Sequence, residues 1–175
     1  RLISSAASDV YKRQAIWVNY YREKFGEEKP YIGGSGYYPN QYPKATYAAM
    51  ISYLDQQVGE LVKKLKEIWK YENTLIIFSS DNGPTHIDHV DIDFFNSAGP
   101  FLNSENTVKC NLNEGGMRVP TIATWPKVIA AGSESNHPSI FYDYLATISD
   151  LVGVTPPYKT VGMSVLPTVK GKSQE

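Results

Sequence analysis

The chain has 175 residues, a length typical of one domain, and 42% of the residues are apolar while 20% are charged. These proportions are those of an ordinary globular protein and exclude the disordered, collagen-like and coiled-coil classes. Seventeen basic residues stand against eighteen acidic ones without forming a basic run, so we expect no nucleic-acid partner. We also expect no membrane span, because no apolar run approaches the roughly 18 residues that one requires.

The first segment of the chain, residues 1–14, resembles translated sequencing adapter joined to an open reading frame. We therefore expect it to be non-native and begin the fold at residue 15. From Ala15 to Pro43 the sequence alternates tyrosines, charged residues and turn formers, with glycines and prolines crowded after Gly33. This pattern predicts irregular structure.

The next segment predicts a helix from about Thr46 to Lys70, because its apolar residues recur at spacings of four and three. The run from Thr74 to Ser79 is apolar and rich in β-branched residues, which is typical of a strand covered on both faces. A helix that leads into such a strand indicates an α/β fold.

Two further elements follow towards the end of the chain. Residues Val119 to Thr124 predict a second strand, with Pro120 at its start or at a sheet edge because proline lacks a ladder donor. Apolar residues from Ile140 to Leu151 predict a second amphipathic helix that ends at Gly153.

Between the two predicted strands, Ser80 to Arg118 show no period, and a stretch of that length usually carries function. Asp81 and Asn82 follow the first strand, where sites collect in open α/β sheets. The turn at Gly83 could converge their oxygens on a hard cation such as Ca²⁺, which needs six to eight oxygen ligands. The alternative is an ordinary Asp-Asn-Gly turn.

A second group of candidate residues begins at Lys109. A lysine ammonium suits the binding of a tetrahedral oxyanion, and Gly115 with Gly116 permits close approach of the backbone. Glu114 and Arg118 could form a salt bridge that holds this loop. The alternative for Lys109 is a solvated surface charge.

Together these residues resemble the sulfatase family of the alkaline phosphatase superfamily. The resemblance rests on Ser-Asp-Asn-Gly-Pro after an apolar strand, on a lysine five places before Glu-Gly-Gly-x-Arg-Val-Pro, and on the Trp-Pro that follows. It covers most of residues 40–172. The stretch from Asp91 to Pro100 resembles in particular bacterial arylsulfatase-like members that act on sulfated sugars.

The resemblance implies a partial alkaline-phosphatase-like α/β sandwich, with a mixed, mostly parallel sheet flanked by helices. It implies hydrolysis of a sulfated carbohydrate or aryl sulfate by a formylglycine nucleophile beside one Ca²⁺. Asp81 and Asn82 correspond to metal ligands, and Lys109 corresponds to the lysine that binds a sulfate oxygen. Residues 15–175 would be the carboxyl-side portion of the catalytic domain of an exported enzyme, periplasmic or extracellular.

The sequence departs from the family at the nucleophile. Formylglycine arises from a Cys or Ser followed two places on by Pro or Ala and four places on by Arg. Cys110, the single cysteine, is followed by Leu112 and Glu114 at those places. We therefore expect the nucleophile to lie in a missing amino-terminal half of the domain, and this chain alone to be inactive.

Two questions stay open at this level: the class of the parent protein and the role of residues 86–93. The parent enzyme could hydrolyse phosphate esters or transfer phosphoglycerol, or the chain could be a non-catalytic sugar-binding remnant built on its tyrosine-rich loops. The cluster of residues 86–93 could bind zinc, form a solvated loop, or contact substrate through His86 or His89. That cluster contains His86, Asp88, His89, Asp91 and Asp93.

Overall fold

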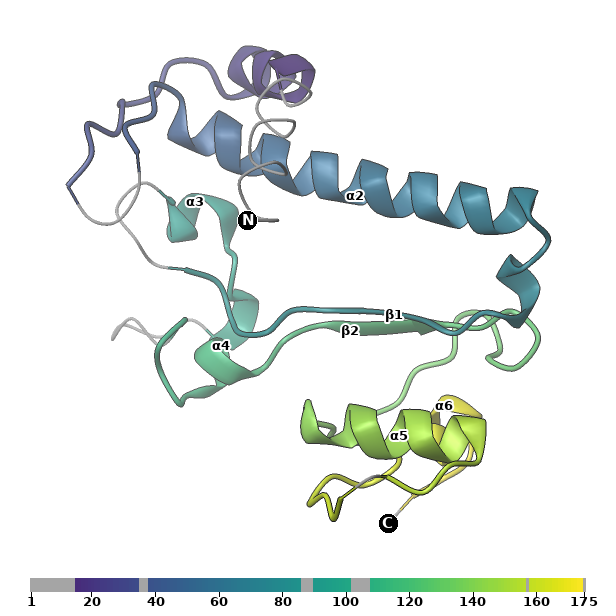
Figure 1. The fold of residues 1–175 in the computed structure, drawn as a ribbon. Helices are drawn as coiled ribbons and strands as arrows, with labels where there is room; N and C mark the ends of the chain where they lie inside the picture. The colour runs from purple at the N-terminus through teal and green to yellow at the C-terminus, as the bar shows by residue number, and fades with distance from the viewer. Residues whose placement is uncertain (1–14, 35–37, 86–89, 102–107, 157, 175) are drawn as a thin grey trace. The chain divides into compact units, whose positions relative to one another are not determined.

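The structure is a computed structural model that describes residues 15–34, 38–85, 90–101, 108–156 and 158–174 (Figure 1). The chain divides into two compact units. Unit 1 comprises Arg1–Lys64 and Ser79–Pro120, and unit 2 comprises Leu65–Phe78 and Thr121–Glu175. Each unit is described separately below.

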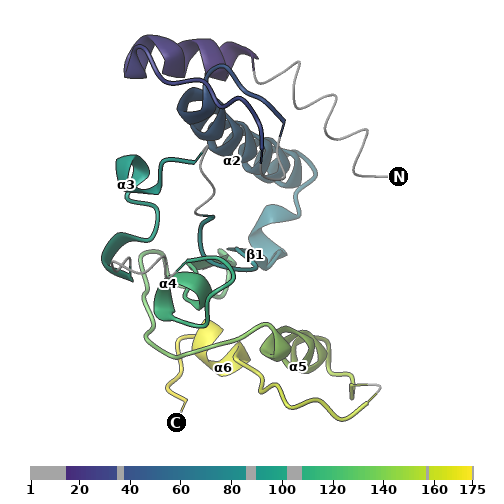
Figure 2. The same cartoon turned by 90° about the vertical axis from the view of Figure 1, so that its left-hand side faces the viewer.

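Residues 15–25 of unit 1 form a helix, so the prediction of irregular structure was wrong for this segment. Trp17, Tyr21 and Phe25 recur at every fourth position and therefore share one face of the helix. This face meets the long helix α2, because Trp17 Nε1 donates to Gln56 at 3.2 Å and the Tyr21 hydroxyl lies 2.7 Å from that of Ser52. The two helices lie side by side in both views (Figure 1 and Figure 2).

Helix α2 (Pro43–Glu67) confirms the longest predicted element and begins three residues earlier than expected. Proline is favoured at the first helical position, where its missing N–H has no intrahelical partner to lose. The Glu28 carboxylate accepts hydrogen bonds from the free amides of Lys44, at 2.6 Å, and Ala45, at 3.2 Å. Helix α2 is therefore capped by a residue distant in sequence.

Where the structure describes the predicted aperiodic region of unit 1, it contains three short elements: α3 (Ile92–Phe95), the 3-10 helix η2 (Gly99–Phe101) and α4 (Glu114–Met117). Phe94 and Phe95 of α3 pack edge-to-face against Phe25, with ring centroids 5.1 and 6.1 Å away. Tyr47 of α2 meets Phe95 at 5.0 Å. These aromatic contacts join α3 to both helices.

Among the described residues the sheet has two strands, β1 (Ile76–Ser79) and β2 (Thr121–Thr124). The 3-10 helix η1 (Tyr71–Asn73) precedes β1. Both strands lie within their predicted ranges, and Pro120 precedes β2 as expected. Phe78 is 41% exposed and Ile122 is 62% exposed. Because Phe78 belongs to β1, the expectation that the first strand is covered on both faces is wrong for the described residues.

The rest of unit 2 is built around α5 (Tyr142–Val152), which ends at Gly153 with φ 70°, as predicted. The buried Asp143 carboxylate accepts from the amides of Ile140 and Met163, each at 2.8 Å. These bonds tie the chain before α6 (Leu166–Val169) to the start of α5. Among the residues described, none of the helices combines the length and apolar character needed to cross a bilayer.

Candidate active site

The turn after β1 presents the two predicted metal ligands. The Ser80 hydroxyl donates to the Asn82 carbonyl at 2.9 Å, and Asn82 Nδ2 donates to the Gly83 carbonyl at 2.9 Å. Because the amide nitrogen of Asn82 is used in this way, its Oδ1 is the atom left to accept or ligate. The Asp81 side chain beside it is exposed.

Lys109 lies on a second tight turn. Val108 is fully buried, and the Asn111 amide donates to its carbonyl at 3.0 Å. Between them, Cys110 adopts φ 72°, a left-handed conformation that is uncommon for a residue with a side chain. The anchored valine and the turn fix the backbone of Lys109 while its side chain is exposed.

The backbone joins these two turns directly. The Gly83 amide donates to the Gly116 carbonyl at 2.8 Å, and the Lys109 amide donates to the Pro84 carbonyl at 2.9 Å. A Cβ on Gly83 would overlap the carbonyl oxygen of Gly115. The close approach therefore requires glycine, and it brings the segments of Asp81, Asn82 and Lys109 together although 27 positions separate Asn82 from Lys109 in the sequence.

Helix α4 supports the same loop. Arg118 forms the expected salt bridge with Glu114, and its guanidinium also lies 5.0 Å from the centre of the Phe101 ring. Gly115 and Gly116 are both buried. The salt bridge expected between Glu114 and Arg118 is therefore confirmed, while the roles of Asp81, Asn82 and Lys109 in chemistry stay a prediction.

Asp91, a member of the acidic and histidine cluster, makes structural contacts. Its carboxylate accepts from the Phe94 amide at 2.9 Å and lies 2.8 Å from Lys44 Nζ. The hydrogen bond from Lys44 is the main cause that lowers the pKa of Asp91 below its ordinary value, and the Phe94 amide adds to it. His86, Asp88 and His89 lie outside the described residues. Within the described ranges, no three His, Cys, Asp or Glu residues gather as a metal-binding group.

The turn at Asp81 fits part of a site for a hard cation. Its donors are one carboxylate and one amide oxygen, the ligand types that Ca²⁺ prefers. No lysine or arginine of the described segments forms a salt bridge with Asp81. This pair would supply only some of the six to eight oxygens that the ion takes.

The hydrogen bonds between the two turns could not be read from the sequence, because each joins residues far apart along the chain. The sequence offered one related signal, the paired glycines at 115 and 116, which permit close approach of the backbone. No local pattern indicated the pairing of Lys44 with Asp91.

Solved structures define the fold class. A chain from Bacteroides thetaiotaomicron, described with the metabolism of multiple glycosaminoglycans, gives a TM-score of 0.57 at 27% identity over 74% of this chain and 28% of that one. A chain crystallised with k-i-k-neocarrahexaose gives 0.57 at 23% identity over 94% and 39%, a likeness of fold alone. The expected partial alkaline-phosphatase-like α/β fold is confirmed.

The chain belongs to the sulfatase family, whose model matches residues 12–154. Human steryl-sulfatase is 34% identical over 134 residues, 73% of this chain and 22% of that protein. Human N-acetylgalactosamine-6-sulfatase is 32% identical over 143 residues, 81% and 25% respectively. The N-acetylglucosamine-6-O-sulfatase of Bacteroides thetaiotaomicron is 28% identical over 173 residues, 94% and 28%. The chain thus spans about a quarter of the length of these relatives.

Proposed function

We propose that this chain forms the carboxyl-side portion of a catalytic domain that hydrolyses a sulfated carbohydrate or an aryl sulfate. The observation that carries the proposal is the pair of backbone hydrogen bonds that joins the Asp81–Asn82 turn to the Lys109 turn. Family membership supports sulfate-ester chemistry. The names of several relatives, which include N-acetylgalactosamine-6-sulfatase and an ulvan-active sulfatase, favour a glycan substrate.

In the proposed site, Asp81 and Asn82 contribute oxygen ligands to Ca²⁺, which as a Lewis acid would polarise a bound sulfate. The Lys109 ammonium binds a sulfate oxygen and stabilises the negative charge that develops on the departing group. The close backbone approach of Gly83 to Gly115 and Gly116 keeps the two turns next to each other. A ligand set of this kind is incomplete without oxygens from elsewhere in the parent protein.

The nucleophile of the proposed reaction is a formylglycine outside these 175 residues. Cys110 does not fit the sequence pattern from which formylglycine arises, because Leu112 and Glu114 stand two and four places after it where Pro or Ala and Arg would be required. The proposal places the parent in the periplasm or outside the cell. It also requires the isolated chain to be inactive, so turnover of an aryl sulfate with Ca²⁺ that depends on Lys109 would contradict this division of the site.

A segment exchange tests the proposal. Residues 43–124 would replace the aligned segment of the Bacteroides thetaiotaomicron relative, with sulfate release measured at saturating Ca²⁺. The chimaera should be active, and Lys109→Ala within the graft should lower kcat by about 100-fold or more, the scale of losing one charge-stabilising group. Lys63→Ala, at an exposed lysine of α2, is the matched control and should leave activity unchanged. Equal rates for both variants would overturn the assignment.

A further inference from the structure

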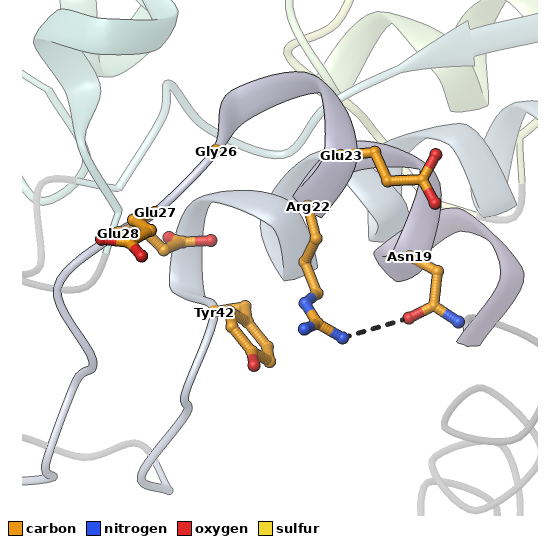
Figure 3. Close-up of a pocket in the computed structure, with 7 residues that line it drawn as sticks. All are labelled: Asn19, Arg22, Glu23, Gly26, Glu27, Glu28 and Tyr42. Atoms are coloured by element: carbon orange, nitrogen blue, oxygen red, sulfur yellow. Dashed lines mark hydrogen bonds between the residues drawn. The ribbon is translucent and has the colours of Figure 1, made fainter.

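A polar hollow lies where the 15–25 helix ends beside the start of α2 (Figure 3). Its volume of about 640 Å³ is within the range of small-molecule sites. None of the residues proposed for sulfate hydrolysis lines it. The side chains that do are those of Asn19, Arg22, Tyr42, Glu23, Glu27 and Glu28.

One side of the hollow is a preorganised donor group. The Arg22 guanidinium stacks on the Tyr42 ring, 3.8 Å from its centre, and donates to Asn19 Oδ1 at 3.3 Å (Figure 3). Stacking and hydrogen bonding hold the planar fork in one orientation. The remaining N–H groups of Arg22 and the amide nitrogen of Asn19 can donate to a ligand.

The carboxylates are the acceptor groups of the hollow. Gly26 ends the helix at φ 76°, its amide donating to the Arg22 carbonyl at 3.0 Å, and turns the chain into Glu27 and Glu28. Glu28 is fixed because it caps α2 through the amides of Lys44 and Ala45. Glu27 is exposed and carries an acceptor-only carboxylate.

Donors and acceptors are not paired with each other. In the described parts of the chain, Arg22 forms no salt bridge with any of the three glutamates, although all line the same hollow. Three carboxylates would repel a negatively charged ligand, and the guanidinium would repel a positively charged one. A hydroxyl group both donates and accepts, so a polyhydroxylated ligand satisfies both groups at once.

We propose that the Arg22–Tyr42 hollow binds a neutral sugar unit through its hydroxyl groups. The inference rests on the proposed function for the kind of ligand, since a glycan substrate offers neutral sugar units as well as sulfated ones. Arg22 and Asn19 donate to the sugar hydroxyls, and Glu27 accepts from them.

Binding is measured on the whole ¹⁵N-labelled chain by titration with N-acetylgalactosamine, and separately with its 6-sulfate, up to millimolar concentrations. The neutral sugar should shift the amides of Asn19, Arg22, Glu28 and Tyr42. Arg22→Ala and Glu27→Gln should each weaken it about tenfold, as expected for loss of a hydrogen bond to a charged group. Lys24→Ala, on the same helix outside the hollow, is the control and should bind normally.

Arg22→Lys separates recognition from folding. It keeps the charge but loses the stacked planar fork, so it should also weaken binding while the circular dichroism stays that of the parent chain. Unshifted amides around the hollow, or equal affinity for Arg22→Ala and Lys24→Ala, would overturn the inference. If the neutral sugar shifts the amides of the hollow while the sulfated sugar leaves Lys109 unshifted, the inference is upheld and the proposed function is contradicted. If the sulfated sugar shifts Lys109 while the amides of the hollow stay unshifted, the inference about the hollow alone is contradicted.

Discussion

Gly83 is the position where a single methyl group should separate the two halves of the candidate site. In Gly83→Ala, the added Cβ overlaps the carbonyl oxygen of Gly115 and lies against Gly116, and both obstacles are backbone atoms that cannot rotate away. Overpacking of this kind costs about 1–3 kcal/mol. Weakening the bonds from the Gly83 and Lys109 amides adds about 0.5–1.5 kcal/mol for each. The expected loss of about 2–6 kcal/mol is a large share of a typical domain stability.

Urea denaturation followed by tryptophan fluorescence gives the free energy of unfolding, and hydrogen exchange reports on the Lys109 amide. The matched control is Gly59→Ala in α2, where a Cβ meets no atom within 4 Å. It should stabilise the chain by about 0.5–1 kcal/mol, because alanine is the better helix former. If Gly83→Ala is as stable as the parent and keeps the Lys109 amide protected, the reasoning about this contact is refuted.

The remaining predictions concern three local contacts. Cys110→Gly should stabilise the chain by about 1 kcal/mol in urea denaturation, because glycine adopts φ 72° without strain, whereas Cys110→Ser should change little. Asp91→Asn keeps the cap on α3 but loses the charge pair with Lys44. Because the side chains of Lys44 and Asp91 are 29% and 39% exposed, the loss of folding stability should stay below about 1 kcal/mol at neutral pH. Because folding lowers the pKa of Asp91, this cost should be full above the ordinary value of 3.8 and vanish as the pH falls through the lower folded-state pKa. Thermal melts of Asp91→Asn and the parent chain across that pH range measure this cost. A cost that persists in acid would contradict the assignment. Asp143→Ala leaves two backbone amides without their acceptor and should cost about 1–3 kcal/mol, and an unchanged melting temperature would show that water replaces the carboxylate.

Elements whose pattern is local were predicted well. The spacing of apolar residues predicted the bounds of α2 within a few residues. The glycine at 153, which adopts a left-handed conformation, marked the end of α5. The helix over 15–25 was missed because its stripe of Trp17, Tyr21 and Phe25 is mixed with charged residues, and its support comes from α2. Tertiary contacts of this kind decide the structure of a segment with weak local preference.

The residues of the candidate site could be predicted from the sequence, but the contacts that bring them together could not. Motifs indicated that Asp81, Asn82 and Lys109 belong to one chemistry, yet only the structure shows the bond between Lys109 and Pro84 that brings their segments together. The hollow at Arg22 had no signal at all, since its lining residues come from a segment predicted to be irregular. Its donor groups depend on stacking against Tyr42, a contact that no sequence pattern encodes.

Titration of the ¹⁵N-labelled chain with Mn²⁺, a hard paramagnetic cation that favours oxygen ligands, would test the shared site most directly. Ion bound by Asp81 and Asn82 should broaden the amide signals of their turn and that of Lys109 in the same concentration range, and Asp81→Ala should abolish both effects. Broadening of the Asp81 turn that leaves Lys109 sharp, or loss of signal that persists in Asp81→Ala, would contradict a common site.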